Sequence, residues 1–196
     1  MKPSNFLNDM FTKGAILGVV MLASNILETS MMYYGASLKW VLLTSVEIVI
    51  ASIIYCWLVL RFTKGYAKLV MSEQSEVSYF TYFNGLNYVV DISMLAGVVV
   101  GLGSYMFRHY IIGFENYIAG YVKLVQDIIS QGEITSSMIG TYEQMFKTIE
   151  SQSEPSLLST IFSSVTNYLL VGSVVGLFVA AKTKQTPKMF DENDEQ

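Results

Sequence analysis

The sequence predicts an all-α membrane protein that crosses a bilayer four times. Of its 196 residues, 52% are hydrophobic and only 14% are charged, whereas soluble domains carry about 25% charged residues. The apolar residues are concentrated in four long stretches. Each stretch is close to the ~20 residues that a helix needs to cross the hydrocarbon core. The sequence therefore predicts a polytopic helical protein rather than a soluble domain.

The four expected spans cover residues 14–34, 40–62, 82–107 and 157–181. The first has Lys2 and Lys13 in front of an apolar core, as a signal peptide does. No small-x-small cleavage site follows it cleanly, so we expect this segment to be retained as a span. We expect residues 1–184 to form a single membrane domain.

The connections differ in length and character. A tight turn at residues 35–39 makes the first two spans an antiparallel pair. The segment FTKGYAKLVMSEQSEV is predicted to be a short cytoplasmic loop. The long outer loop, residues 108–156, has apolar residues at three- and four-residue steps within 111–129 and again within 138–149. This spacing predicts an extracytoplasmic hairpin of two amphipathic helices. The hairpin either caps the bundle or lies on the membrane, or is simply a packed loop.

The orientation follows from the placement of lysine and arginine. With the N-terminus cytoplasmic, eight of these residues fall in cytoplasmic segments and four in outer segments. Cytoplasmic segments carry the excess of positive charge in membrane proteins. We therefore expect both termini in the cytoplasm of a bacterial cell, with the protein in the inner membrane. The acidic tail, residues 185–196, is expected to be disordered.

Several of these features resemble a known family. The motif RFTKGY closes the second span, SYFTYFNGL opens the third, and an amphipathic outer segment precedes the fourth. Together they resemble the four-span membrane proteins of Bacteroidetes grouped as domain-of-unknown-function family 4199. The resemblance covers residues 14 to 184 and implies no catalytic residue. It also implies a partner, because genes of this family often lie beside a glycosyltransferase similar to the polyprenyl-phosphate sugar transferases.

Polar side chains inside the spans form the candidate site. Ionisable groups in a membrane are costly unless they are protonated, paired or hydrated, and they often mark function. Glu28 and Glu47 lie at comparable depth on neighbouring spans and could share a proton. The alternative is that these groups only hydrogen-bond neighbouring helices. The residues singled out are Asn25, Glu28, Glu47, Asn87, Asp91 and Asn167.

Three spans also carry the G-x-x-x-G pattern, which lets helix backbones approach closely. The glycines are Gly14, Gly18, Gly97, Gly101, Gly172 and Gly176. Packing within one chain is the expected use. A face for a homo-oligomer is the alternative.

Several classes of function are disfavoured. The formal net charge of −4 argues against nucleic-acid binding. His109 is the one histidine, so a site with several histidine ligands is excluded. Cys56 is the one cysteine and is expected to pack within a span. No catalytic motif, metal site or cofactor is predicted, and we expect the chain not to be an enzyme.

Two hypotheses for the function remain consistent with the sequence. The leading hypothesis is a non-enzymatic accessory or scaffold subunit in an envelope glycan or lipid-linked sugar pathway. Its expected partners are the bilayer and a membrane glycosyltransferase or another envelope protein. The alternative is a small, oligomeric, proton-coupled transporter that uses Glu28, Glu47 and Asp91. A carrier needs hydrated carboxylates, whereas a scaffold can keep them packed.

Overall fold

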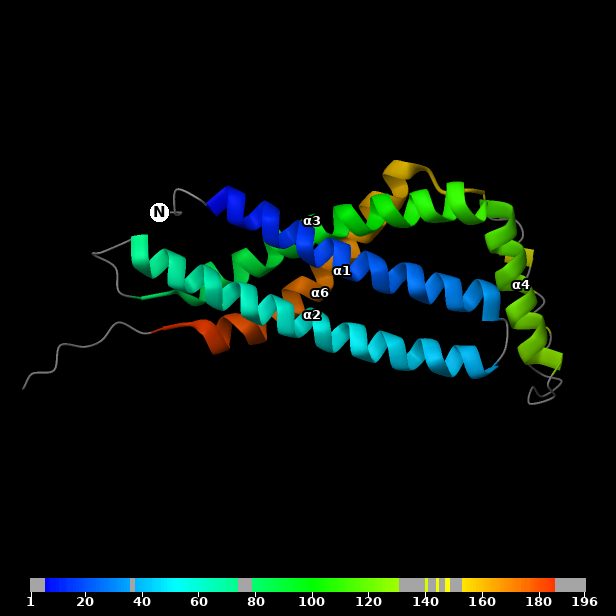
Figure 1. The fold of residues 1–196 in the computed structure, drawn as a ribbon, viewed down its shortest axis with the longest axis horizontal. Coiled ribbons are helices and arrows are strands. Elements are labelled where there is room, and N and C mark those ends of the chain that lie inside the picture. Colours follow the sequence, from blue (N-terminus) through cyan, green and yellow to red (C-terminus); the bar gives the residue numbers. More distant parts are fainter. Residues whose placement is uncertain are drawn as a thin grey trace, which may run out of the picture.

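The chain folds as a bundle of long helices in the computed structural model (Figure 1), which describes residues 6–35, 38–73, 79–130, 140, 144, 147, 148 and 153–185. The helices are α1 (Phe6–Gly35), α2 (Leu38–Glu73), α3 (Tyr82–Met106), the π-helical turn η1 (Phe107–Ile112), α4 (Phe114–Ser130) and α6 (Leu157–Thr183). No strand occurs in this part of the chain.

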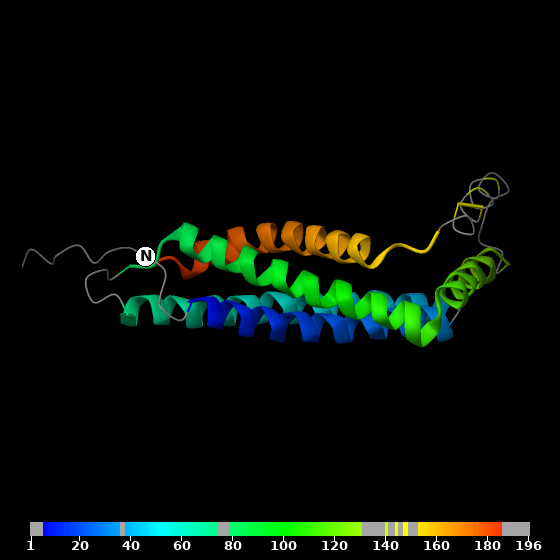
Figure 2. The same cartoon turned by 90° about the horizontal axis from the view of Figure 1, so that it is seen from above.

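Four of the helices are long and apolar enough to cross a membrane, which confirms the predicted all-α chain with four helices of span length. The candidate spans are Phe6–Met31, Leu42–Ser72, Tyr82–Ile112 and Leu157–Thr183. We call the end of the bundle where α1 begins and α6 ends the basal end, and the opposite end the α4 end. Seen from above, α3 crosses between a layer made by α1 and α2 and the single helix α6 (Figure 2). α3 is therefore the central helix of the bundle.

Two helices extend further at the basal end than the sequence predicted. α1 begins at Phe6 rather than at residue 14, and α2 continues to Glu73 rather than ending at residue 62. The prediction of a loop after the second span was therefore wrong, because most of that segment is helical. The polar residues of this segment suggested a loop, but they lie on one face of a helix. Lys64 and Lys68 are exposed, whereas Tyr66 and Val70 on the opposite face are only 5% and 3% exposed.

At the α4 end, the third span also continues beyond its predicted limit. Residues 107–112 form the π-helical turn η1, of which the sequence placed residues 108–112 at the start of the outer loop. Gly113 then ends it with a φ of 84°, a conformation that favours glycine. The chain turns sharply there, and α4 lies across the end of the bundle (Figure 1).

α4 is the first helix of the predicted hairpin, and it contacts the end of α1. A Cβ on Gly120 would approach the Tyr33 ring to 2.6 Å, so glycine permits this close contact. Leu124 is 5% exposed, whereas Glu115 and Lys123 are on the exposed face. The second predicted helix, residues 138–149, lies largely outside the described residues, as does the tail from residue 186.

Candidate functional site

Two adjacent residues of α1 carry hydrogen bonds to two different helices. The Ser24 hydroxyl donates to Oε1 of Glu47 on α2. The Ser104 hydroxyl of α3 donates to Oδ1 of Asn25 over 2.7 Å. Successive helical residues point about 100° apart, so one turn of α1 can serve both neighbours. Glu47 and Asn25 are thus both engaged in bonds between helices.

Glu28 lies one turn further along α1 and is half-buried. Glu47 and Arg108 both lie within electrostatic range of its carboxylate. The structure therefore places the two carboxylates predicted to lie at similar depth within electrostatic range of one another. It also places the cation Arg108 within electrostatic range of Glu28, which the sequence did not anticipate.

Arg108 reaches this region because the third span does not end where the sequence suggested. We placed residue 108 in the outer loop, but it lies on η1, so its side chain remains on the bundle. The guanidinium carbon lies 5.1 Å from the centre of the Tyr117 ring of α4. Its Nε is buried and has no hydrogen-bond partner in the described part of the chain. Single π-turns of this kind are frequent at functional sites.

A cavity of about 350 Å³, here called the polar cavity, lies beside Arg108. α1, α3 and η1 contribute Asn25, Val100, Gly101, Ser104 and Arg108. The other wall comes from the first part of α6 and the segment before it: Pro155, Ser159, Thr160, Ser163, Ser164, Asn167 and Tyr168. Asn167, which the sequence singled out, is therefore one member of a longer polar wall. The four-residue spacing of Ser159, Ser163 and Asn167 was visible in the sequence and could have revealed it.

A second buried polar contact lies near the middle of the bundle. The hydroxyls of Tyr55 on α2 and Ser93 on α3 are 2.7 Å apart. Ser93 also donates to the carbonyl of Val89 over 2.6 Å. Tyr55 and Ser93 are 3% and 0% exposed, so each satisfies a group that would otherwise be costly to bury. Sequence reasoning missed both residues because single hydroxyls are common in spans.

The basal end holds a cluster of aromatic rings. Tyr66 and Tyr88 are stacked, with ring centroids 4.2 Å apart and planes at 8°. The Tyr88 hydroxyl donates to Oδ2 of Asp9 over 2.6 Å. Asp91 lies within electrostatic range of Tyr66, while Asn87 is exposed. The structure thus separates Asp91 and Asn87 from the other candidate residues and adds Asp9.

The six glycines of the G-x-x-x-G pairs all lie at contacts between helices of the same chain. Gly14 and Gly18 of α1 face α3, where added Cβ atoms would lie 2.7 Å from Leu95 and 2.6 Å from Val99. The remaining contacts join α3 and α6: Gly97 meets Val165, Gly101 meets Ile161, Gly172 meets Ser93, and Gly176 meets Leu86, all closer than 3.0 Å. These glycines let both α1 and α6 pack tightly on α3.

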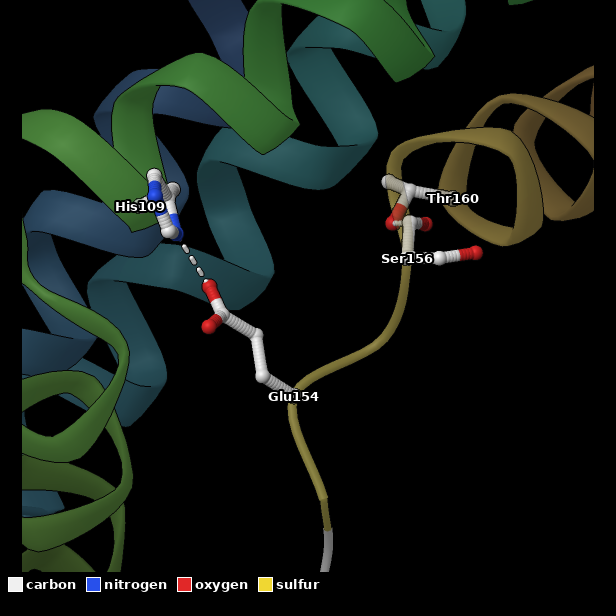
Figure 3. Close-up of polar contacts among 4 residues, drawn as sticks. All are labelled: His109, Glu154, Ser156 and Thr160. Carbon is white, nitrogen blue, oxygen red and sulfur yellow. Dashed lines mark hydrogen bonds and ion pairs between the residues drawn. The ribbon is translucent and has the colours of Figure 1, made fainter.

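A polar contact connects the end of the third span to the segment that leads into α6. Nδ1 of His109 contacts Oε1 of Glu154, just before the turn at Ser156 and Thr160 where α6 begins (Figure 3). The His109 ring also stacks on Tyr105, with centroids 5.3 Å apart. A cavity of about 880 Å³ lies between this pair and α4. Both side chains are more than a third exposed, so the pair contributes little stability.

The largely apolar groove between α1 and α2 also reaches Glu47. It has a volume of about 440 Å³ and is lined by Met21, Leu27, Leu43, Val46, Ile50 and their neighbours. Oε2 of Glu47 is buried and has no hydrogen-bond partner in the described part of the chain. One oxygen of this carboxyl group is therefore bonded to Ser24, and the other is not satisfied.

No family model matches the chain, and neither a curated protein nor a solved structure is similar enough to count as a match. The resemblance to domain-of-unknown-function family 4199 therefore stays a prediction. Within the described ranges, no group of three or more His, Cys, Asp or Glu side chains could hold a metal ion. The function must be argued from the geometry of the polar contacts and cavities.

Proposed function

We propose that the protein is a non-enzymatic accessory or scaffold subunit of a bacterial inner membrane, with both termini in the cytoplasm. The orientation is supported by the lysine and arginine distribution, eight against four. The expected pathway, assembly of an envelope glycan or a lipid-linked sugar, comes from the resemblance to family 4199. The expected partner is a membrane glycosyltransferase or another envelope protein.

The observation that carries the proposal is the pairing of polar groups between helices. Ser24 bonds Glu47, Ser104 bonds Asn25, Tyr55 bonds Ser93, and Tyr88 bonds Asp9. Each bond joins two different helices, and together they connect α1, α2 and α3. Such bonds contribute on the order of 0.6 kcal/mol each in membrane proteins. Polar residues used in this way fix the geometry of a bundle.

The surface offered to a partner is the outer face of α2. Val49, Ile53 and Trp57 are 59%, 64% and 55% exposed and lie at four-residue steps along one face. This face binds lipid or the span of a partner, and an apolar face of this kind suits both. A scaffold subunit needs such a face in addition to a stable bundle.

A specific observation supports the transporter alternative. Oε2 of Glu47 is buried without a hydrogen-bond partner in the described part of the chain, and Glu28 lies within electrostatic range of Glu47. Two neighbouring carboxylates can exchange a proton, which is the chemistry that a proton-coupled carrier requires.

Reconstitution of the full chain into liposomes that contain a pH-sensitive dye separates the two functions. The scaffold proposal expects an imposed proton gradient to decay as it does in protein-free liposomes. A faster decay that is lost in Glu47→Gln and kept in Glu115→Gln would establish the transporter. Glu115 is an exposed carboxylate of α4 outside the four candidate spans and serves as the matched control.

The scaffold proposal is also tested directly by a photo-crosslinking residue at Ile53, on the outer face of α2. In the native membrane, this residue should form a defined adduct with an envelope enzyme. The matched control is Ile92 of α3, which is 0% exposed and should give no intermolecular adduct. Adducts at neither position, with lipid alone crosslinked at Ile53, would contradict the proposal.

A further inference from the structure

The polar cavity between α1, α3 and α6 has the properties of an anion site. Among the described residues of its lining, Arg108 is the one charged side chain, and the other polar groups are hydroxyls and amides. The first turn of α6 borders the cavity through Ser159 and Thr160. A helix N-terminus carries about half a positive charge and favours an anion. The Arg108 guanidinium and the N-terminal turn of α6 are therefore two sources of positive charge beside the same polar cavity.

The donors of this cavity are incompletely used. Nε of Arg108 is buried without a hydrogen-bond partner in the described residues, and a buried donor without a partner is costly. No aspartate or glutamate of the described ranges comes within salt-bridge distance of Arg108. The Glu28 carboxylate interacts with the Arg108 guanidinium electrostatically, but over more than a salt-bridge distance. The ring of Tyr117 supports the guanidinium from α4, so the side chain is held in place before a ligand arrives.

The ligand must be an acceptor that can take several hydrogen bonds at once. A guanidinium presents its N–H groups as a planar fork that matches the oxygens of a phosphate or carboxylate. Ser163, Ser164 and Asn167 add donors from α6, and their side chains have no hydrogen-bond partner within the described part of the chain. A tetrahedral oxyanion uses donors that come from several directions, as these do.

The position of the cavity indicates how the anion is carried. Ser159, Ser163 and Asn167 are exposed along one side of α6, so the cavity opens toward the flank of the bundle. Leu158 and Phe162 on the same helix are 78% and 75% exposed, as expected for side chains that face lipid. The first turns of a span lie near the headgroup level of a bilayer. An anionic group at this level, with acyl chains beside α6, would fill the opening.

We propose that the polar cavity binds an oxyanion of the phosphate type, with Arg108 as its principal ligand. A lipid headgroup and free phosphate share this chemistry, and the lateral opening favours the headgroup. This inference is independent of the scaffold function, because it depends only on the cavity and its charges.

The test uses the purified full chain in an uncharged detergent and measures thermal unfolding during ligand titration. The probes are phosphatidylglycerol in mixed micelles, phosphatidylcholine in the same micelles, and inorganic phosphate. Phosphatidylglycerol should raise the melting temperature of the wild type more than phosphatidylcholine does. Arg108→Gln should weaken the apparent affinity for phosphatidylglycerol about tenfold or more, because it removes a charge-assisted bond.

Arg61→Gln is the matched control. The chain has two arginines, and each packs on an aromatic ring, Arg61 on Trp57 at 5.2 Å and Arg108 on Tyr117 at 5.1 Å. Both variants lose one positive charge, but Arg61 lies in the half of α2 toward the basal end, whereas the polar cavity lies toward the α4 end. Arg61→Gln should retain the affinity of the wild type.

Each other result has a definite meaning. Stabilisation by inorganic phosphate but not by phosphatidylglycerol would keep the anion site and assign it to a free anion. Equal stabilisation by both lipids, equal loss in both arginine variants, or no stabilisation by any probe would overturn the proposal. If Arg108→Gln does not fold, Asn167→Leu replaces it. Asn167 is exposed in the cavity wall, so this variant should fold and bind phosphatidylglycerol several-fold more weakly.

Discussion

Substitution of Gly101 by alanine should separate α6 from α3. An added Cβ would lie 2.7 Å from the Cα of Ile161, whereas ordinary contacts begin at 3.4 Å. The neighbouring atom is backbone and cannot rotate away, so α6 would have to move by about 0.7 Å, the difference between these distances. Overpacking of this kind costs about 1–3 kcal/mol.

The matched control is Gly65→Ala in α2. Nothing lies within 4 Å of the position that its Cβ would occupy. Both variants gain the higher helix propensity of alanine, worth about 1 kcal/mol. That gain cancels in the comparison, so Gly101→Ala should be less stable than Gly65→Ala by about 1–3 kcal/mol, the whole cost of overpacking.

The free energy of unfolding can be measured by titrating sodium dodecyl sulfate into chain purified in mild detergent, with helix content followed by circular dichroism. Gly65→Ala should be at least as stable as the wild type. Equal stability of the two variants would refute the reasoning, since it would mean that α6 does not pack on α3 at Gly101.

Two further predictions use the same preparation. Tyr88→Phe removes the hydroxyl that donates to Asp9 and keeps the stacked ring, so it should cost on the order of 0.6 kcal/mol in the same titration; a loss several times larger would show that the bond acts as part of a wider network. In a Cys56→Ser background, a cysteine at Ser153 should react with an impermeant thiol reagent in intact cells and one at Ser72 should not, although both positions are exposed; the reverse labelling would invert the proposed orientation.

The hydrophobic pattern predicted the four spans well because length and apolar composition are local properties. The ends of the spans were less predictable. A span end that contains Lys64 and Lys68 looks like a loop in the sequence, although Tyr66 and Val70 bury the opposite face against the bundle. Whether a mixed segment is helical depends on a partner surface, which a single segment does not reveal.

The polar residues were found, but their partners were not. Glu47 stood out because its neighbours are uncharged, whereas Ser24 and Ser104 are ordinary residues for a span. Arg108 was assigned to a loop, because its place on the bundle depends on η1 and on the turn at Gly113. Depth along a helix follows from sequence distance, but the direction in which a residue faces depends on how the helices pack.

The length of α2 has a consequence for the membrane that the protein can occupy. Lys39 and Arg61 are 22 residues apart, about 33 Å along a helix, which is close to the ~30 Å of the hydrocarbon core. The 12 residues from Arg61 to Glu73 extend about 18 Å further, and only at the basal end. In a thicker bilayer, the helical turn that carries Arg61 and Lys64 can therefore enter the hydrocarbon region. The long side chains of these two residues can still reach the headgroups. The bundle should thus tolerate a bilayer thicker than its hydrophobic length at its basal end, while the α4 end, closed by the turn at Gly113, sets a fixed depth.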